Sequence, residues 1–184
     1  MEKNCPVHGY FEAVICSDLP TYTRLRETPR KVTRPPRPGG SRTNKGCPND
    51  CGLCPAHDQH TCLAILEIVS NCDLQCSVCL ADAPLKGHHI EIPDLQSALK
   101  SLISCEGDVA PLQIGGGEAT LHPDLASIIR ETCRLGFTRI EMDTNGLALA
   151  REPDLSERLR EPGLTSVYPQ MDGLSPAVSK FIRG

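Results

Sequence analysis

The stretch that decides the fold is LAILEIVSNCDLQCSVC, residues 63–79. Its first seven residues are almost all apolar and rich in β-branched side chains, as expected of a buried strand in a parallel sheet. Cys72, Cys76 and Cys79 follow soon after this strand. Parallel α/β folds place reactive groups at the carboxyl ends of their strands, so the sequence predicts a thiolate site there.

The same cysteine spacing occurs a second time, upstream. Cys47, Cys51 and Cys54 repeat the pattern, and Cys62 adds a fourth thiol. Three thiolates can hold three irons of a cubane cluster and leave the fourth iron open, as in a catalytic site, whereas four thiolates close the coordination. We therefore expect the downstream group to hold a catalytic cluster and the upstream group an auxiliary one. A four-cysteine zinc site is the alternative for the upstream group.

The composition favours metal chemistry over disulfides. The chain of 184 residues contains 11 cysteines, begins with no apolar signal peptide and has no apolar run long enough for a transmembrane segment. Clustered cysteines in a reducing compartment usually bind metal, and we expect a cytoplasmic protein. With 3% aromatic residues, no tryptophan and a net charge of −4, the chain lacks the features of a nucleic-acid binder.

The composition also divides the chain into regions. These are a small Cys/His unit (residues 1–23), a Pro/Arg-rich linker (24–45), the first cysteine group (46–62) and an α/β region (63–184). The prolines predict that the linker is extended and not helical. In the first unit, Cys5 and His8 are candidate metal ligands, and Cys16 is either a third ligand or a buried thiol.

Helix and strand patterns alternate after the second cysteine group. Strands are expected at residues 63–69, 111–115, 137–143 and 165–172, and helices at 93–104, 122–136, 153–161 and from 175 onward. Pro-Asp-Leu recurs every thirty residues at three of these helix starts, and thirty residues is the size of a βα unit. The pattern predicts an α/β fold with about four βα units, too few to close an eight-stranded barrel.

Glycines and polar residues stand at the ends of the later strands. GGE (Gly116, Gly117, Glu118) ends the second strand, where glycines allow a close backbone approach to a ligand and a carboxylate pairs with an ammonium group. DTNG (143–146) and QMDG (170–173) end the third and fourth strands. Turn formation is the alternative interpretation of these last two stretches.

These signatures, in this order, resemble those of the radical S-adenosylmethionine superfamily. The run from Gly46 to Ala81 resembles more closely a subgroup that includes archaeal tetraether lipid synthases and proteins once assigned as pterin methyltransferases. The resemblance implies a partial (βα) barrel of the radical SAM type, preceded by a small cysteine-rich metal-binding region in which residues 1–23 form an incomplete metal knuckle. Because that partial barrel has six strands, we expect the sequence to be part of a longer chain.

The resemblance also implies cofactors and site residues. Cys72, Cys76 and Cys79 would hold a [4Fe-4S] cluster that binds S-adenosylmethionine, and the upstream cysteines a second, auxiliary [4Fe-4S] cluster. The residues implied to contact S-adenosylmethionine are Gly116, Gly117, Glu118, Thr144, Asn145 and Gln170. One departure is Val78, since the residue before the last cysteine of the loop is often aromatic in the superfamily.

The implied activity is that of a radical SAM enzyme. A reductant such as ferredoxin or flavodoxin would supply an electron, and cleavage of S-adenosylmethionine would give a 5′-deoxyadenosyl radical that activates a C–H bond of a small-molecule or lipid substrate. Three outcomes stay open: carbon–carbon bond formation on a lipid chain, methyl transfer to a pterin-like substrate, and a non-catalytic iron–sulfur or zinc module. A lipid substrate would bring the cytoplasmic protein to a membrane.

Overall fold

The computed structural model describes residues 1–28, 44–45, 49, 60–107 and 111–183. It divides into two compact units, Met1–Val32 and Thr33–Gly184. The boundary between them falls inside the predicted linker, and the finer boundaries at residues 23, 45 and 62 stay predictions.

The first unit is a hairpin followed by one helix. Its elements are β1 (Glu2–Cys5), β2 (Gly9–Glu12), which pairs antiparallel with β1, and α1 (Leu19–Glu27). The hairpin brings Cys5 Sγ to 3.4 Å from His8 Nδ1. Cys16 is exposed, so its interpretation as a buried thiol is wrong.

The helix α1 corrects the prediction for the start of the linker. It extends to Glu27, so the first four residues of the region expected to be extended are helical. The reason is that Pro29 is the first proline of that region, and a proline disfavours helix only from the residue before it onward. At the other end, Asp18 Oδ1 accepts a hydrogen bond from the backbone N–H of Thr21 over 3.3 Å and caps the helix.

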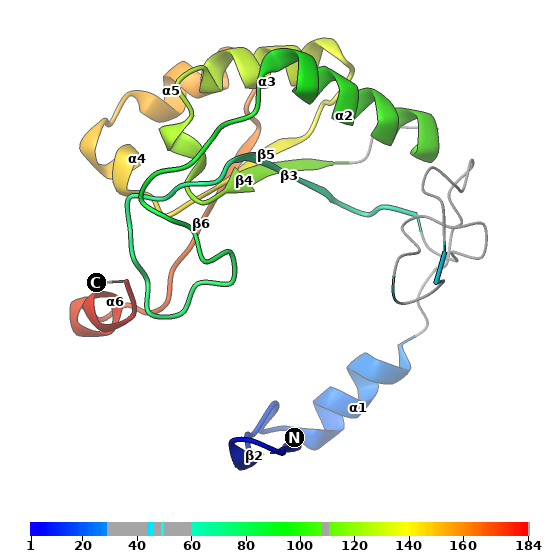
Figure 1. Cartoon of the computed structure of the whole chain (residues 1–184), viewed down its shortest axis with the longest axis vertical. Helices are drawn as coiled ribbons and strands as arrows, with labels where there is room; N and C mark the ends of the chain where they lie inside the picture. The colour runs from blue at the N-terminus through cyan, green and yellow to red at the C-terminus, as the bar shows by residue number, and fades with distance from the viewer. Residues whose placement is uncertain (29–43, 46–48, 50–59, 108–110, 184) are drawn as a thin grey trace. The chain divides into compact units, whose positions relative to one another are not determined.

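The second unit is an α/β structure built on a parallel sheet (Figure 1). The strands are β3 (Ala64–Val69), β4 (Leu112–Gly116), β5 (Ile140–Thr144) and β6 (Ser166–Pro169), and they lie side by side in chain order. The helices are α2 (Ile92–Glu106), the 3-10 turn η1 (Ala119–Leu121), α3 (Leu125–Arg134), α4 (Leu147–Arg151), α5 (Leu155–Arg160) and α6 (Pro176–Arg183). The four predicted βα units are confirmed, and α4 is an additional short helix that the sequence pattern did not predict.

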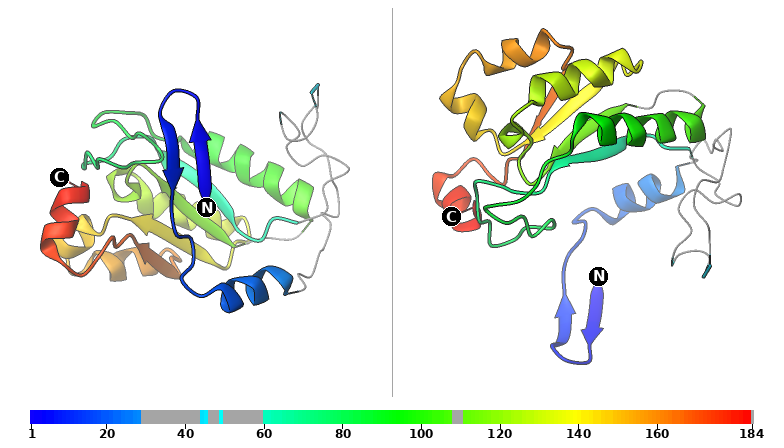
Figure 2. Two further views of the ribbon diagram at one scale, coloured as in Figure 1. Left: turned by 90° about the horizontal axis from the view of Figure 1, so that it is seen from below. Right: turned by 45° about the horizontal axis from the view of Figure 1, so that its top comes forward.

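The helices α2, α3 and α5 cover one face of this sheet (Figures 1 and 2). The core between them is apolar and includes Leu95, Leu99, Ile114, Ile128, Ile129, Ile140 and Met142, each at most 1% exposed. The helices expected at residues 93–104 and 122–136 are therefore confirmed, and each contributes leucine or isoleucine side chains to this core. Gly107, in the left-handed region at φ 72°, ends α2 by donating its N–H to Ile103 O over 2.9 Å.

The other face of the sheet is mostly polar, although it also carries the exposed side chains of Ile65 and Tyr168. Because side chains alternate along a strand, the residues that face away from the helices form rows across neighbouring strands. One row pairs Gln113 with Glu141 and Glu141 with Ser166, and the next pairs Asp143 with Tyr168. Gln113 Nε2 donates to Glu141 Oε1 over 2.7 Å. Among the described residues, no helix is long and apolar enough to cross a lipid bilayer.

Candidate functional site

The carboxyl ends of the strands surround a cavity of about 590 Å³. The residues predicted from the sequence that line it are Cys72, Cys76, Cys79, Gly116, Gly117, Thr144, Asn145 and Gln170. They come from the loop after β3 and from the ends of β4, β5 and β6. Segments that are up to about a hundred residues apart in the sequence thus meet at one edge of the sheet, as parallel strands require.

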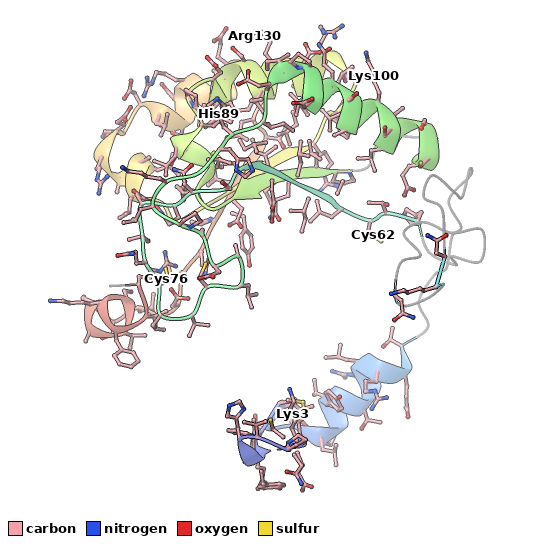
Figure 3. All side chains as sticks on the ribbon, viewed as in Figure 1. Lys3, Cys62, Cys76, His89, Lys100 and Arg130 are labelled. Atoms are coloured by element: carbon pink, nitrogen blue, oxygen red, sulfur yellow. The ribbon has the colours of Figure 1, made fainter. Side chains whose placement is uncertain are left out.

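The cluster loop, residues 70–89, leaves β3 and returns beside it. The backbone N–H of Ser70 donates to His88 O, and that of Cys72 donates to Pro84 O, each over 2.9 Å. Further along the loop, the N–H of Ser77 donates to Ile182 O of α6 over 2.9 Å. Cys72 is buried, whereas Cys76 is partly exposed and Cys79 exposed (Figure 3 labels Cys76 on this loop). The loop is therefore held most firmly at its first cysteine.

The three thiols of the cluster loop line one cavity. Among the residues that the structure describes, no group of three His, Cys, Asp or Glu side chains is placed to hold a single metal ion. A cubane binds each cysteine to a different iron, so its ligands are spread over the cluster's surface. Three thiols around one cavity are compatible with that requirement, and the assignment of a cluster to Cys72, Cys76 and Cys79 stays a prediction.

The sulfur of Cys72 sits among hydrogen-bond donors. The backbone N–H of Leu74 lies 3.4 Å from Cys72 Sγ, and Asn145 Nδ2 lies 3.9 Å from it. Burial raises the pKa of the Cys72 thiol, and the negative charges of Asp73 and Glu118 act in the same direction. Iron would have to displace the proton of this thiol, since thiolates are the species that ligate metal.

Gly116 and Gly117 lie against the chain that enters the cluster loop. A Cβ on Gly116 would be 1.9 Å from Val69 O, and one on Gly117 would be 2.2 Å from Asn71 O. The contact includes two hydrogen bonds of 2.9 Å, from Gly117 N–H to Val69 O and from Glu118 N–H to Asn71 O. These glycines are therefore needed for the packing of β4 against the base of the loop, a reason that the sequence alone did not supply.

Glu118 is buried at 2% exposure, and its carboxylate is fully engaged within the protein. Oε1 accepts from Thr120 N–H over 3.1 Å, from Thr120 Oγ1 over 2.6 Å and from Thr144 Oγ1 over 2.7 Å. Oε2 accepts from Asn145 N–H over 2.6 Å. A carboxylate has about four acceptor positions. The pairing of Glu118 with an ammonium group stays a prediction, and the contact present here ties η1 to the end of β5.

Three charged residues at the cavity were not assigned from the sequence. Asp143 lines the cavity, and burial, followed by the charge of Glu118, raises the pKa of its carboxyl group. Arg183 of α6 donates from Nε to Asp172 Oδ2 over 2.5 Å, with both side chains less than a fifth exposed. Arg183 also donates to the backbone carbonyl of Gln170. Both aspartates stand in the stretches 143–146 and 170–173, for which turn formation was the alternative interpretation.

The first cysteine group is described only at its end. Cys47, Cys51 and Cys54 lie outside the described residues. Cys62 is exposed (Figure 3), and its neighbour Thr61 donates its N–H to the buried carboxylate of Glu106 over 3.1 Å. The auxiliary site therefore stays a prediction. The hydrogen bond between Thr61 and Glu106 fixes the segment just before β3 to the end of α2.

Comparisons with known proteins identify the family. The Radical SAM superfamily matches residues 66–184. The chain is 30% identical, over an alignment of 191 residues, to 7,8-dihydro-6-hydroxymethylpterin dimethyltransferase of Methanocaldococcus jannaschii, covering 100% of this chain and 36% of that protein. It is 28% identical over 130 residues to a probable GTP 3′,8-cyclase of Methanothermobacter marburgensis, covering 68% of this chain and 41% of that protein.

A solved structure shares the fold. Streptococcus suis SuiB, bound to its precursor peptide SuiA, matches with a TM-score of 0.53 and 16% identity, over 66% of this chain and 27% of SuiB. The chain thus spans well under half the length of these relatives. The predicted α/β fold of the partial-barrel type is confirmed, and the family match over residues 66–184 means that the chain belongs to the radical S-adenosylmethionine superfamily.

Proposed function

We propose that this chain carries the S-adenosylmethionine site of a radical SAM enzyme. The proposal rests on the meeting of three cysteines, two glycines and the ends of β5 and β6 around one cavity. Its volume of about 590 Å³ is within the range of small-molecule sites, roughly 300–1,000 Å³. When bound and reduced, a [4Fe-4S] cluster on Cys72, Cys76 and Cys79 would supply the electron that cleaves S-adenosylmethionine to methionine and a 5′-deoxyadenosyl radical.

The protein's own contribution would be to bind and orient. The glycine edge of β4 brings the backbone to the cavity, and Thr144 and Gln170 add polar groups from β5 and β6. Arg183 joins α6 to this edge through Asp172 and through backbone carbonyls. Such fixed walls hold a ligand in one orientation and exclude water from the reacting atoms.

We favour a polar, hydrogen-bond-donating substrate, such as a pterin, over a lipid chain. The face of the sheet away from the helices carries Glu67, Glu141 and Asp143, together with Gln113 and Ser166. Burying carboxylates against an alkyl chain is unfavourable, whereas the N–H groups of an aminopyrimidine ring pair with them. The relative that matches this chain from end to end is named a pterin dimethyltransferase, which supports the same choice.

A lipid substrate remains the second candidate because of the cluster loop. Val78 and Leu80 line the cavity and are strongly exposed, at 74% and 105%. Such apolar side chains at a cavity mouth could contact an alkyl chain. Carbon–carbon bond formation on a lipid is therefore the alternative that the substrate experiment has to distinguish.

We also propose an auxiliary cluster on Cys47, Cys51, Cys54 and Cys62, fed with electrons by a reductant such as ferredoxin or flavodoxin. The support is the fourth thiol, which closes the coordination. Iron and zinc analysis of the purified chain distinguishes the alternatives. A zinc ion per chain that persists after anaerobic iron reconstitution would contradict the cluster.

Electron paramagnetic resonance on the anaerobically reconstituted, reduced full chain tests the main proposal. Adding S-adenosylmethionine should shift the signal of one cluster, because the ligand binds its open iron. Replacing Cys72, Cys76 and Cys79 with alanine should abolish that shift and the formation of 5′-deoxyadenosine. The matched control, Cys62→Ala, should keep the ligand-dependent shift. A shift that survives the triple replacement would contradict the assignment of the two groups.

Titration calorimetry of the loaded chain with a reduced pterin and with a detergent-dispersed long-chain ether lipid tests the substrate class. We expect the pterin to bind, and Glu141→Gln to weaken it about tenfold, as for the loss of one charged hydrogen bond. Glu157→Gln on α5, a helix on the opposite face of the sheet, is the control. Binding of the lipid with no binding of the pterin would favour the second candidate.

A further inference from the structure

A hydrogen-bonded clasp joins the cluster loop to the end of β5. Asn145 Nδ2 donates to Asp73 Oδ1 over 2.7 Å, and the same nitrogen lies 3.9 Å from Cys72 Sγ. The other end of this amide is also used, because Asn145 Oδ1 accepts from the backbone N–H of Leu147 over 2.9 Å. Both ends of the Asn145 side chain are therefore engaged within the protein, which leaves little of its hydrogen-bonding capacity for a ligand.

The backbone that carries this side chain is fixed as well. The N–H of Asn145 donates to Glu118 Oε2 over 2.6 Å, and Glu118 is buried. Its carboxylate also accepts from Thr144 Oγ1 over 2.7 Å. Since Asn145 is anchored to a buried carboxylate between β4 and η1, its side chain can hold the loop in place rather than move with it.

We propose that Asn145 is a positioning residue for Cys72 and acts through Asp73. The clasp fixes the first cysteine of the loop and keeps an N–H donor beside its sulfur. Donors near cluster sulfurs are among the features that set a cluster's reduction potential, and such outer partners also orient the ligands. The proposal rests on the function proposed above only in taking Cys72 as a cluster ligand. It gives Asn145 a task different from the S-adenosylmethionine contact that the resemblance implies.

Alkylation of the metal-free full chain with iodoacetamide, followed cysteine by cysteine with mass spectrometry, tests the clasp without a cluster. Asn145→Ala should speed the alkylation of Cys72 about three- to tenfold, the factor expected from losing one hydrogen bond. Asp73→Ala should speed it at least as much, because it removes both the acceptor and a charge that raises the pKa of the Cys72 thiol. Asp73→Asn removes the same charge but keeps an acceptor, so Cys72 should be alkylated more slowly in Asp73→Asn than in Asp73→Ala. Arg151→Ala is the matched control, because it removes only a 3.9 Å ion pair with Asp73 at an exposed side chain. Cys133, which is packed under Gly163, should react at its wild-type rate in every variant.

A redox titration of the anaerobically loaded chain gives the second readout. At a fixed applied potential, Asn145→Ala should lower the ratio of reduced to oxidised cluster by about threefold or more, because a donor to the thiolate is lost. Unchanged Cys72 alkylation together with an unchanged ratio would overturn the proposal. So would a loss of S-adenosylmethionine affinity with neither change, which would return Asn145 to ligand contact. If alkylation responds but the wild-type chain takes up no cluster, the clasp stands and the proposed function fails.

Discussion

Replacing Gly116 with alanine tests whether close packing at the base of the cluster loop is what requires glycine. The new Cβ would lie 1.9 Å from Val69 O, a backbone atom, so the overlap can be relieved only by moving β3 or β4. Gly116 also has a φ of 132°, which side chains with a Cβ rarely adopt. Backbone strain costs about 1–3 kcal/mol and overpacking about 1–3 kcal/mol, so we expect the free energy of unfolding to fall by about 2–6 kcal/mol.

Two further glycines separate the two contributions. Gly117→Ala has the overlap without a positive φ, since its Cβ would lie 2.2 Å from Asn71 O, and we expect a loss of about 1–3 kcal/mol. Gly146→Ala has a φ of 82° with open space around the new Cβ, and we expect a loss of about 1–2 kcal/mol. Urea unfolding of the metal-free chain, followed by circular dichroism, measures all three. If Gly116→Ala were no more destabilising than Gly146→Ala and Gly117→Ala were neutral, the reasoning from close packing would be refuted.

Three other substitutions test single groups. Burial raises the pKa of the Asp143 carboxyl group. The stability that this group contributes is therefore present below its unfolded-state pKa and is lost as pH rises through its folded-state pKa. Asp143→Asn should be more stable than the wild type at neutral pH, as measured by urea midpoints at pH values from below the unfolded-state pKa to neutral. The hydrogen bond from Arg134 lowers the pKa of Glu131 from 4.5 to about 2. The stability that this pair provides is therefore present above pH 4.5 and is lost as pH falls toward 2. Between these pH values, Glu131→Gln should lose less stability than the wild type in acid unfolding curves. Glu106→Ala leaves Thr61 without its buried acceptor and should lower the free energy of unfolding by about 1–3 kcal/mol, whereas Glu106→Gln, which keeps an oxygen, should lose less in the same urea assay.

The sequence predicted the parts of the site that are local in the chain. The apolar run before Cys72 predicted β3, and the cysteine spacing predicted the loop that follows it. The thirty-residue recurrence of Pro-Asp-Leu predicted three helix starts to within a few residues. The proline and aspartate lie in the first turn of α2, whereas in α3 and α5 the aspartate is the N-cap residue and the proline precedes it. The carboxyl ends of parallel strands share one edge of the sheet, so the sequence alone predicted that the motifs after the second, third and fourth strands lie near the cysteines.

What the sequence could not predict are contacts between those edges. The pairing of Arg183 with Asp172 depends on how α6 returns to the end of β6, and no local pattern encodes that path. For the same reason, no local pattern predicted the hydrogen bond from Asn145 to Asp73, and the contact of Asn145 with S-adenosylmethionine stays a prediction. The α1 helix differs from the prediction for a local reason. The region 24–45 as a whole has the composition of an extended linker, but its first residues are good helix formers and continue the helix.

These contacts fix the beginning of the cluster loop within the protein. Residues 69–72 are held on one side by hydrogen bonds from Gly117 and Glu118 and on the other by those with Pro84 and His88, whereas Cys79 is exposed. Part of the free energy of metal binding normally goes into ordering the ligands, and a ligand that is already fixed reduces that cost. In a metal site on this loop, Cys72 would be the ligand whose position the protein fixes most strongly. This accounts for the dense hydrogen bonding at the first cysteine and the exposure of the third within a single loop.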